Sequence, residues 1–246
     1  MDNCRIETLI IGASFYGMAL LKTLGKNAML VERGYRIGAE FSSSLRVSGF
    51  DREVKTELGK SFLRRMTEHK LLDGSGAIYS TPAAYLLADM SVGANALFAT
   101  EVLSIEKENG TYKLELFNCE GRCTVFADRI VDTTAEGAVR VGVGTKKRLN
   151  VILAEPTTET EYDSFTGGNI FGFPAGLSET LPETRSRLYE LLESENMGAV
   201  FVADIFDYKI EKTVYKKDDN YYIIPSLGFG NPISAVDEGG GHGYGF

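Results

Sequence analysis

The amino-acid sequence predicts an α/β fold built on a Rossmann-like, mostly parallel sheet. Thr8–Ile11 is a short apolar run that ends at Gly12, and Ala28–Val31 is a second such run. Unbroken apolar runs of this length are typical of strands that are buried on both faces of a parallel sheet. Between them, Ser14–Leu24 carries apolar residues at helical spacing and is followed by Gly25, a stop signal. A strand, a glycine turn, a helix and a second strand in this order form the smallest parallel βαβ unit.

Downstream of this unit, the sequence predicts two helices and an antiparallel meander. A helix is expected over 57–72, and Thr81-Pro82 opens another, because proline is tolerated in the first turn of a helix. Asn109-Gly110 is a strong tight-turn dipeptide between two strand-like runs. The meander is expected to consist of strands 96–105, 111–117 and 123–131, the last of which runs back into the parallel sheet. The predicted fold thus has helices on both sides of the sheet, the meander as a further layer, and a small inserted α+β region.

The segment most informative about function is the glycine turn of the βαβ unit. It reads Gly12-Ala13-Ser14-Phe15-Tyr16-Gly17, and Glu32 follows at the end of the second strand. Gly12 permits a sharp exit from the strand, a small residue at position 14 lets a diphosphate approach the backbone, and Gly17 lets the helix pack closely. The helix start points free amides at phosphates, and Glu32 is placed to accept hydrogen bonds from ribose hydroxyls. The pattern predicts dinucleotide binding.

Two other interpretations of this unit remain open. One is a glycine turn in an ordinary βαβ unit that binds no ligand. Ser14 stands where the motif usually has its middle glycine, which weakens the match, although its hydroxyl is able to contact a phosphate. The other is an NAD(P)-binding dehydrogenase, which explains this first unit but not the segments near Thr133 and Gly228.

With further segments in the same order, the chain resembles the FAD-dependent oxidoreductases with a glutathione-reductase-type fold. Val31-Glu32-Arg33-Gly34 and then Ile37-Gly38-Ala39 are similar to that family's second strand and to the loop that crosses the flavin's phosphates. Ala99-Thr100-Glu101-Val102 is similar to the strand whose backbone meets the adenine. Thr133-Thr134-Ala135 is similar to a second family signature, in which Ala135 stands where glycine is usual. The resemblance implies that these segments bind FAD.

The segment 221–239 resembles the family's last strand and glycine turn, which lead into a helix whose start faces the flavin. Asn231 is suited to cap that helix and Pro232 to occupy its first position. The resemblance implies that Gly228, Gly230, Asn231 and Pro232 lie near the flavin ring. Because 239–245 is so rich in glycine, the helix is expected to end after about two turns.

The resemblance implies a FAD-dependent oxidoreductase that acts on a small molecule. Its FAD-binding domain would comprise 1–149, a small substrate or cap region 150–217, and a return to the first domain with a glycine-rich tail 218–246. Within the second region, 155–178 is expected to be a loop, because it is rich in Thr, Gly and Pro. The small second region and Ala135 also suit an alternative, a reduced or truncated flavin-binding protein without turnover.

The sequence assigns no catalytic residue. The flavin ring itself carries hydride or electrons, so the protein's share is binding, orientation and electronic tuning. No second glycine fingerprint for a nicotinamide is evident, and electrons would come from the substrate, a separate donor or acceptor, or a briefly bound nicotinamide. His69 lies on a charged helix face and His242 in the glycine-rich tail. Ser42–Ser44 and Arg46 are either contacts to phosphate or an acidic substrate, or simply a polar loop.

Composition narrows the range of partners. The chain has 246 residues, of which 43% are hydrophobic and 24% charged, as in ordinary globular proteins. Its net charge of -8 disfavours nucleic acid as a partner. The longest apolar stretch, 9–21, is too short to span a membrane, and three scattered cysteines suit a reducing compartment and leave too few ligands for zinc. We therefore expect a cytoplasmic protein.

Overall fold

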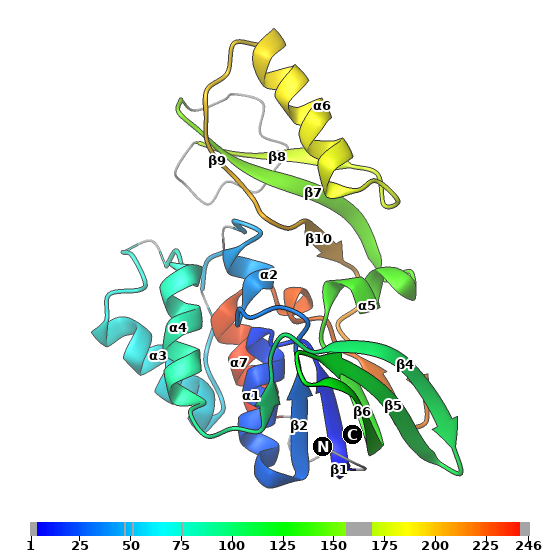
Figure 1. Cartoon of the computed structure of the whole chain (residues 1–246). Helices are drawn as coiled ribbons and strands as arrows, with labels where there is room; N and C mark the ends of the chain where they lie inside the picture. Colours follow the sequence, from blue (N-terminus) through cyan, green and yellow to red (C-terminus); the bar gives the residue numbers. More distant parts are fainter. Residues whose placement is uncertain (1–3, 47, 51, 75, 156–168, 242–246) are drawn as a thin grey trace.

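The computed structural model describes residues 4–46, 48–50, 52–74, 76–155 and 169–241, which form a larger unit and a smaller one (Figure 1). The larger unit contains an eight-stranded sheet with the order β11-β12-β6-β1-β2-β3, to which β4 and β5 are added through β6. Neighbouring strands from β12 to β3 are parallel, and β11 is an antiparallel edge. The predicted α/β class and mostly parallel sheet are confirmed. The strands on this path are β1 (Cys4–Ile11), β2 (Ala28–Val31), β3 (Ala96–Leu97), β6 (Gly121–Asp132), β11 (Tyr215–Asp218) and β12 (Tyr221–Ile223).

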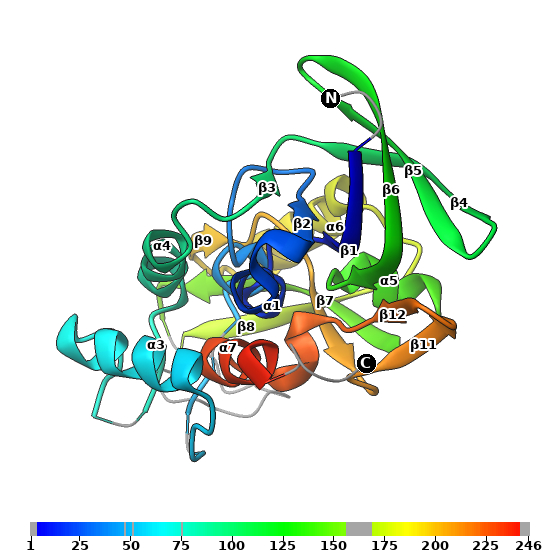
Figure 2. The ribbon, with the colours of Figure 1, turned by 90° about the horizontal axis from the view of Figure 1, so that it is seen from below.

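The helices gather on one face of this sheet. Helices α1 (Phe15–Leu24) and α7 (Pro232–Gly241) lie side by side, with α3 (Glu57–Glu68) and α4 (Ser80–Met90) outside them (Figure 2). Buried residues of β1 and β2 that point to this face, such as Ile10 and Leu30, join the side chains of α1 and α7 in one core. Short helical segments are η1 (Gly25–Asn27), α2 (Ala39–Ser42), α5 (Ala135–Arg140) and η2 (Ser226–Phe229).

The predicted meander covers the opposite face of the sheet. It is formed by β4 (Glu101–Glu108), β5 (Thr111–Asn118) and the first part of β6, joined through Asn109-Gly110 with both residues at positive φ. Alternate residues of the parallel strands, such as Leu9 and Met29, pack on meander residues such as Leu114. The predicted strand 96–105 is interrupted, because Ala99 adopts a positive φ between β3 and β4. The second face of the sheet is therefore packed against strands, whereas the sequence predicted helices on both sides of the sheet.

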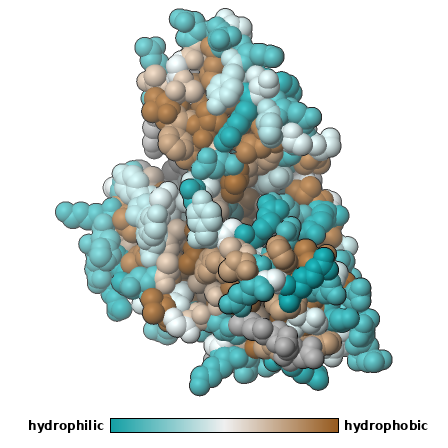
Figure 3. Space-filling view, in the orientation of Figure 1, coloured by the Kyte–Doolittle hydropathy of each residue, from teal (hydrophilic) through white to brown (hydrophobic). Residues whose placement is uncertain are grey.

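The smaller unit is the inserted α+β region that the sequence predicts. Strands β7 (Gly144–Leu153), β8 (Ile170–Ala175), β9 (Ala199–Val202) and β10 (Asp207–Ile210) form an antiparallel sheet. Helix α6 (Leu181–Ser194) covers one of its faces, where Leu188 and Leu192 pack on Leu149 and Val151. Val200 and Phe201 of β9 remain exposed. Figure 3 shows brown, hydrophobic surface in the upper part of the molecule, where the smaller unit lies. The sheet begins at Gly144, six residues before the predicted boundary at 150.

Two sequence-based expectations were wrong. Part of the predicted loop 155–178 is strand β8, which pairs with β7 along its whole length. Its Pro174 is tolerated because β8 is an edge strand. The glycine-rich tail also holds a helix, since α7 continues to Gly241. A Cβ atom on Gly239 would lie 2.7 Å from the Tyr16 carbonyl oxygen and 2.8 Å from the Ala19 Cβ, so the glycine permits close packing of α7 on α1.

We predict that Gly239→Ala destabilises the fold, because the methyl group has no space between α7 and α1. The expected loss is about 1–3 kcal/mol of unfolding free energy, as for other overpacked cores, measured by urea denaturation. Gly241→Ala is the matched control in the same helix, where the nearest atom would be at an ordinary 3.5 Å. Equal stability of the two variants would show that α7 does not pack on α1 as described.

Candidate functional site

The glycine turn after β1 packs closely against the turn after β6. Gly12 has a φ of 97°, and a Cβ atom there would lie 2.8 Å from Thr134 Cγ2 and 3.0 Å from Thr133 Oγ1. A Cβ atom on Gly17 would lie 2.5 Å from the Gly12 carbonyl oxygen. Both positions therefore require glycine for the close approach of β1, α1 and the end of β6, as the motif predicts.

Ser14 uses its hydroxyl within the protein. It is the N-cap of α1, with Oγ accepting from the Gly17 amide at 2.9 Å and donating to Thr133 Oγ1 at 2.8 Å. Thr133 in turn donates to the carbonyl oxygens of Ile11 and Gly12, both at 3.0 Å. In this arrangement Ser14 and Thr133 hold the turn in shape, and a direct contact of Ser14 with phosphate stays a prediction.

Glu32 lies where the motif places it, at the end of β2 and half-buried. One carboxylate oxygen accepts from the Ala13 amide at 2.8 Å and the other from the Gly34 amide at 2.6 Å. Each carboxylate oxygen can accept a further hydrogen bond. The group is thus held in one orientation and can still accept hydroxyl donors such as those of a ribose.

A second glutamate, Glu40, was missed by the sequence reasoning. It belongs to α2, and its carboxyl group contacts the start of α1. Glu40 on α2 accepts from the Phe15 amide at 2.8 Å, and the Ser226 hydroxyl also hydrogen-bonds to it. Burial raises the pKa of Glu40 to about 7; the two hydrogen bonds act in the opposite sense, and the nearby Glu32 charge adds to the rise. Ser226 Oγ also accepts from the Tyr16 amide at 3.3 Å. The only sequence signal was a carboxylate next to Gly38-Ala39, in the loop expected to cross the phosphates.

Phe15 and Tyr16 contribute their backbone to this turn while their side chains lie in the core. Phe15 is fully buried beside Phe41, and a Cβ atom on Gly38 would lie 2.3 Å from its ring. Tyr16 stacks on Phe229 with ring centroids 5.0 Å apart, and burial raises the pKa of its hydroxyl far above the usual range. Any binding role of these two residues is therefore limited to their amides.

The remaining residues of the first domain lie around the same edge of the sheet. Thr134 caps α5 by accepting from the Gly137 amide, which places Ala135 at the first position of that helix. Arg33 is exposed and pairs with Glu136 at 3.7 Å. Gly38 donates its amide to the Ala13 carbonyl oxygen and precedes Ala39, the first residue of α2. Val102 follows in β4 and is half-buried.

The C-terminal motif reaches the same site. The Asn231 side chain accepts from the Ser234 amide at 2.8 Å and Pro232 begins α7, so the predicted helix start is confirmed. Gly228 lies in η2, and Gly230 follows with a φ of 82°. The Ser234 hydroxyl is buried and finds no hydrogen-bond partner among the described atoms. Through Ser226, this segment contacts the start of α1, and the position of Gly228–Pro232 near a flavin ring stays a prediction.

Other residues considered from the sequence lie elsewhere. His69 is exposed at the end of α3, and His242 lies outside the described residues. Arg46 donates to Asp207 of β10 at 2.8 Å and to the Tyr208 carbonyl oxygen, so it joins the two units. Within the described ranges there is no group of three or more acidic, His or Cys side chains that could hold a metal ion. No helix in those ranges is long and apolar enough to cross a membrane.

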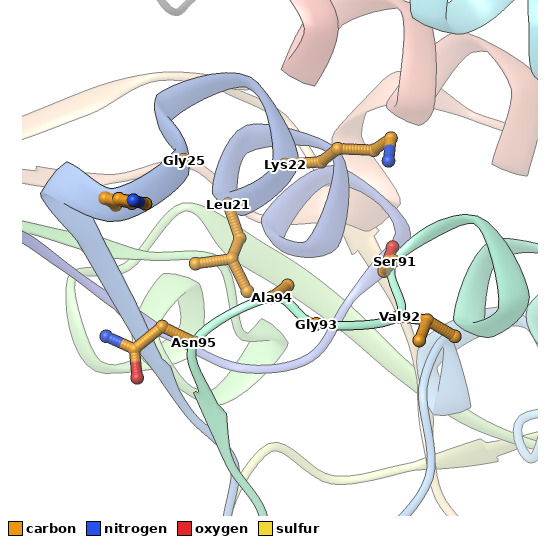
Figure 4. Close-up of a pocket in the computed structure, with 9 residues that line it drawn as sticks. Leu21, Lys22, Gly25, Ser91, Val92, Gly93, Ala94 and Asn95 are labelled. Carbon is orange, nitrogen blue, oxygen red and sulfur yellow. The ribbon is translucent and has the colours of Figure 1, made fainter.

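A small cleft of about 230 Å³ lies at the other end of α1 (Figure 4). It is formed by the last turn of α1 and the connection from α4 to β3, and Lys22 donates to the Met90 carbonyl oxygen beside it. It is far along α1 from the glycine turn and separate from the site described above. The cleft is lined by Leu21, Lys22, Gly25, Lys26, Ser91, Val92, Gly93, Ala94 and Asn95.

Comparison with solved structures identifies the fold. L-Proline dehydrogenase from P. horikoshii matches with a TM-score of 0.54 and 15% identity, over 96% of this chain and 92% of its own. A geranylgeranyl bacteriochlorophyll reductase-like protein from Thermoplasma acidophilum matches with a TM-score of 0.58 and 10% identity, over 98% and 78%. A flavoprotein/dehydrogenase from Cytophaga hutchinsonii matches with a TM-score of 0.52 and 14% identity, over 97% and 77%. The chain therefore shares the fold of these three proteins, one of which is named as a flavoprotein.

Sequence comparisons assign this chain to no family. No family model matches the chain. No curated protein matches it either. At identities of this size the structural matches establish the fold alone, and function has to be argued from the site itself.

We predict that Glu40 makes stability depend on pH. Its folded-state pKa of about 7 exceeds the unfolded value of 4.5, so the folded state holds the proton more tightly. The resulting stabilisation is complete below the unfolded pKa and is lost as pH rises through the folded pKa, by up to about 3 kcal/mol. Unfolding free energies of wild type and Glu40→Gln, measured from about pH 5 to about pH 8, should separate progressively in favour of the variant. A constant difference would contradict the burial of an ionisable Glu40.

Proposed function

We propose that this protein is a FAD-dependent oxidoreductase that acts on a small molecule. The observation that carries the proposal is the arrangement of β1, the Gly12 turn, α1 and Glu32, with Glu32 fixed by the Ala13 and Gly34 amides. This is the constellation that binds an adenine dinucleotide in Rossmann-type units. The match to a protein named as a flavoprotein/dehydrogenase supports a flavin as the dinucleotide's reactive part.

The residues present fit the two halves of FAD to different degrees. For the adenosine half, Glu32 offers unused lone pairs at the end of β2. For the ring half, the start of α7 offers a capped helix end and the unpartnered Ser234 hydroxyl. For the diphosphate, the Gly12 turn provides close backbone approach, although the Phe15 amide already has Glu40 as its acceptor. The site therefore fits FAD, with Glu40 as its departure from the usual pattern.

In this proposal each element of the chain has a physical task. Glu32 accepts hydrogen bonds from the ribose, and the first turn of α1 lies against the diphosphate. The positive end of the α7 dipole favours negative charge on a group placed at Asn231 and Pro232. A bound FAD supplies the hydride or electron chemistry. We assign no acid or base to the substrate, and the small unit of β7–β10 is proposed as the substrate-facing region.

A flavin-binding protein without turnover is the second candidate. It is favoured by the internal acceptors at this helix start, since Glu40, Ser226 and Ser14 already satisfy the first three α1 amides. Glu32 satisfies the Ala13 amide of the preceding turn. The alternative in which the protein binds only a nicotinamide dinucleotide does not explain why η2 and α7 are joined to the glycine turn. A visible flavin spectrum of the purified protein would decide against that alternative.

We predict that Glu32→Gln lowers the affinity for FAD by about tenfold or more, because the ribose loses a charged acceptor and one amide faces a donor. Affinity is measured by titrating the flavin-free protein with FAD and following flavin fluorescence. Glu57→Gln is the control, since the Glu57 side chain is 93% exposed on α3 and pairs with Lys60. Unchanged affinity of Glu32→Gln in a folded protein would sink the proposed FAD site.

We predict that FAD bound to this protein is reoxidised at different rates by different acceptors after photoreduction. An enzyme site presents the ring to small molecules, whereas a passive binder shields it or leaves it open to oxygen alone. The measurement is the return of the flavin absorption under anaerobic conditions after addition of each acceptor. Indifference to every acceptor and donor tried would favour the protein without turnover.

A further inference from the structure

Glu40 occupies the position at which a diphosphate would meet the first turn of α1. Its Oε1 accepts from the Phe15 amide at 2.8 Å, and it also hydrogen-bonds to Ser226. Helix starts bind phosphate through these same free amides. A dinucleotide that binds here must therefore place its phosphate oxygens against the Glu40 carboxyl group.

The charges around Glu40 do not offset a second anion. Glu32 is the other carboxylate near it and acts to raise its pKa. The arginines of the loop that carries Glu40 are paired with the smaller unit, Arg36 with Asp204 at 3.3 Å and Arg46 with Asp207 at 2.8 Å. A carboxylate and a diphosphate in contact at this place would repel each other strongly, because a partly buried pair is poorly screened.

The charged side chains on the neighbouring elements also interact with groups other than Glu40. On α5 and beside β2, Arg140 pairs with Asp132 and Arg33 with Glu136. On α7, Asp237 accepts from the Lys55 and Thr56 amides at the start of α3. Glu238 of α7 acts on the Tyr16 hydroxyl. Neutralising Glu40 itself would relieve the repulsion.

Resting on the proposed FAD site, we propose that Glu40 takes up one proton from solvent when the diphosphate binds, and then donates a hydrogen bond to a phosphate oxygen. Its Oε1 keeps the hydrogen bond from Phe15 as a carbonyl oxygen, and Oε2 carries the proton. No bond of the cofactor is made or broken. The pKa of about 7 in the free protein means that this proton is gained at little cost near neutral pH.

The test is the affinity for FAD measured by titration calorimetry at about pH 6 and about pH 8, in buffers of different ionisation enthalpy. We expect binding to be about tenfold weaker at the higher pH, with proton uptake that approaches one per FAD there. Glu40→Gln keeps an oxygen for the Phe15 amide and is neutral at every pH. It should bind FAD equally at both values and without proton uptake, whereas Glu57→Gln should behave as wild type.

The outcomes separate this inference from the proposed function. Binding of FAD that is independent of pH, or tighter at the higher pH with proton release, would mean that Glu40 stays charged or leaves the site. Either result would overturn the role of Glu40 while the FAD site stands. Absence of FAD binding by wild type and Glu40→Gln at both pH values would overturn both proposals.

Discussion

The backbone amides in the first turn of α1 impose the main constraint on this structure. A helix start leaves its amides without intrahelical acceptors, and burying them unpaired is costly. Here the acceptors come from three places along the chain, namely Ser14, Glu40 and Ser226, while Glu32 accepts from the Ala13 amide of the preceding turn. Because Ser226 lies more than two hundred positions after Tyr16, satisfying this one turn ties the C-terminal segment to the first βαβ unit.

The features that could be predicted from the sequence are those that depend on residues close together in the chain. The βαβ unit, the turn at Asn109-Gly110 and the helix start at Pro232 each follow from local preferences, and each is confirmed. Strand β8 and the end of α7 were missed because their stability comes from partners distant in sequence. Edge pairing with β7 overrides the Pro174 signal, and contact with α1 overrides the low helix propensity of Gly239.

The candidate site shows the same difference between features set by local sequence and features set by distant contacts. The positions of Gly12, Gly17 and Glu32 could be predicted because they are fixed relative to one strand and one helix. Glu40 could not, since its contact with the Phe15 amide depends on how the loop after β2 folds back across the helix start. Ser14 illustrates the limit of a motif, because its hydroxyl is drawn to Thr133 from a segment more than one hundred positions away.

The loop that carries Glu40 also connects the site to the smaller unit. Asp207 of β10 is only 1% exposed and is held by both Arg46 and Arg148, which satisfies a buried charge. Asn150 donates to the Ser44 carbonyl oxygen at 2.8 Å, and the Asp204 amide donates to the Ser43 carbonyl oxygen. These bonds fix the end of α2 only a few residues beyond Glu40. A shift of the smaller unit would therefore be transmitted through this loop to the carboxyl group at the start of α1.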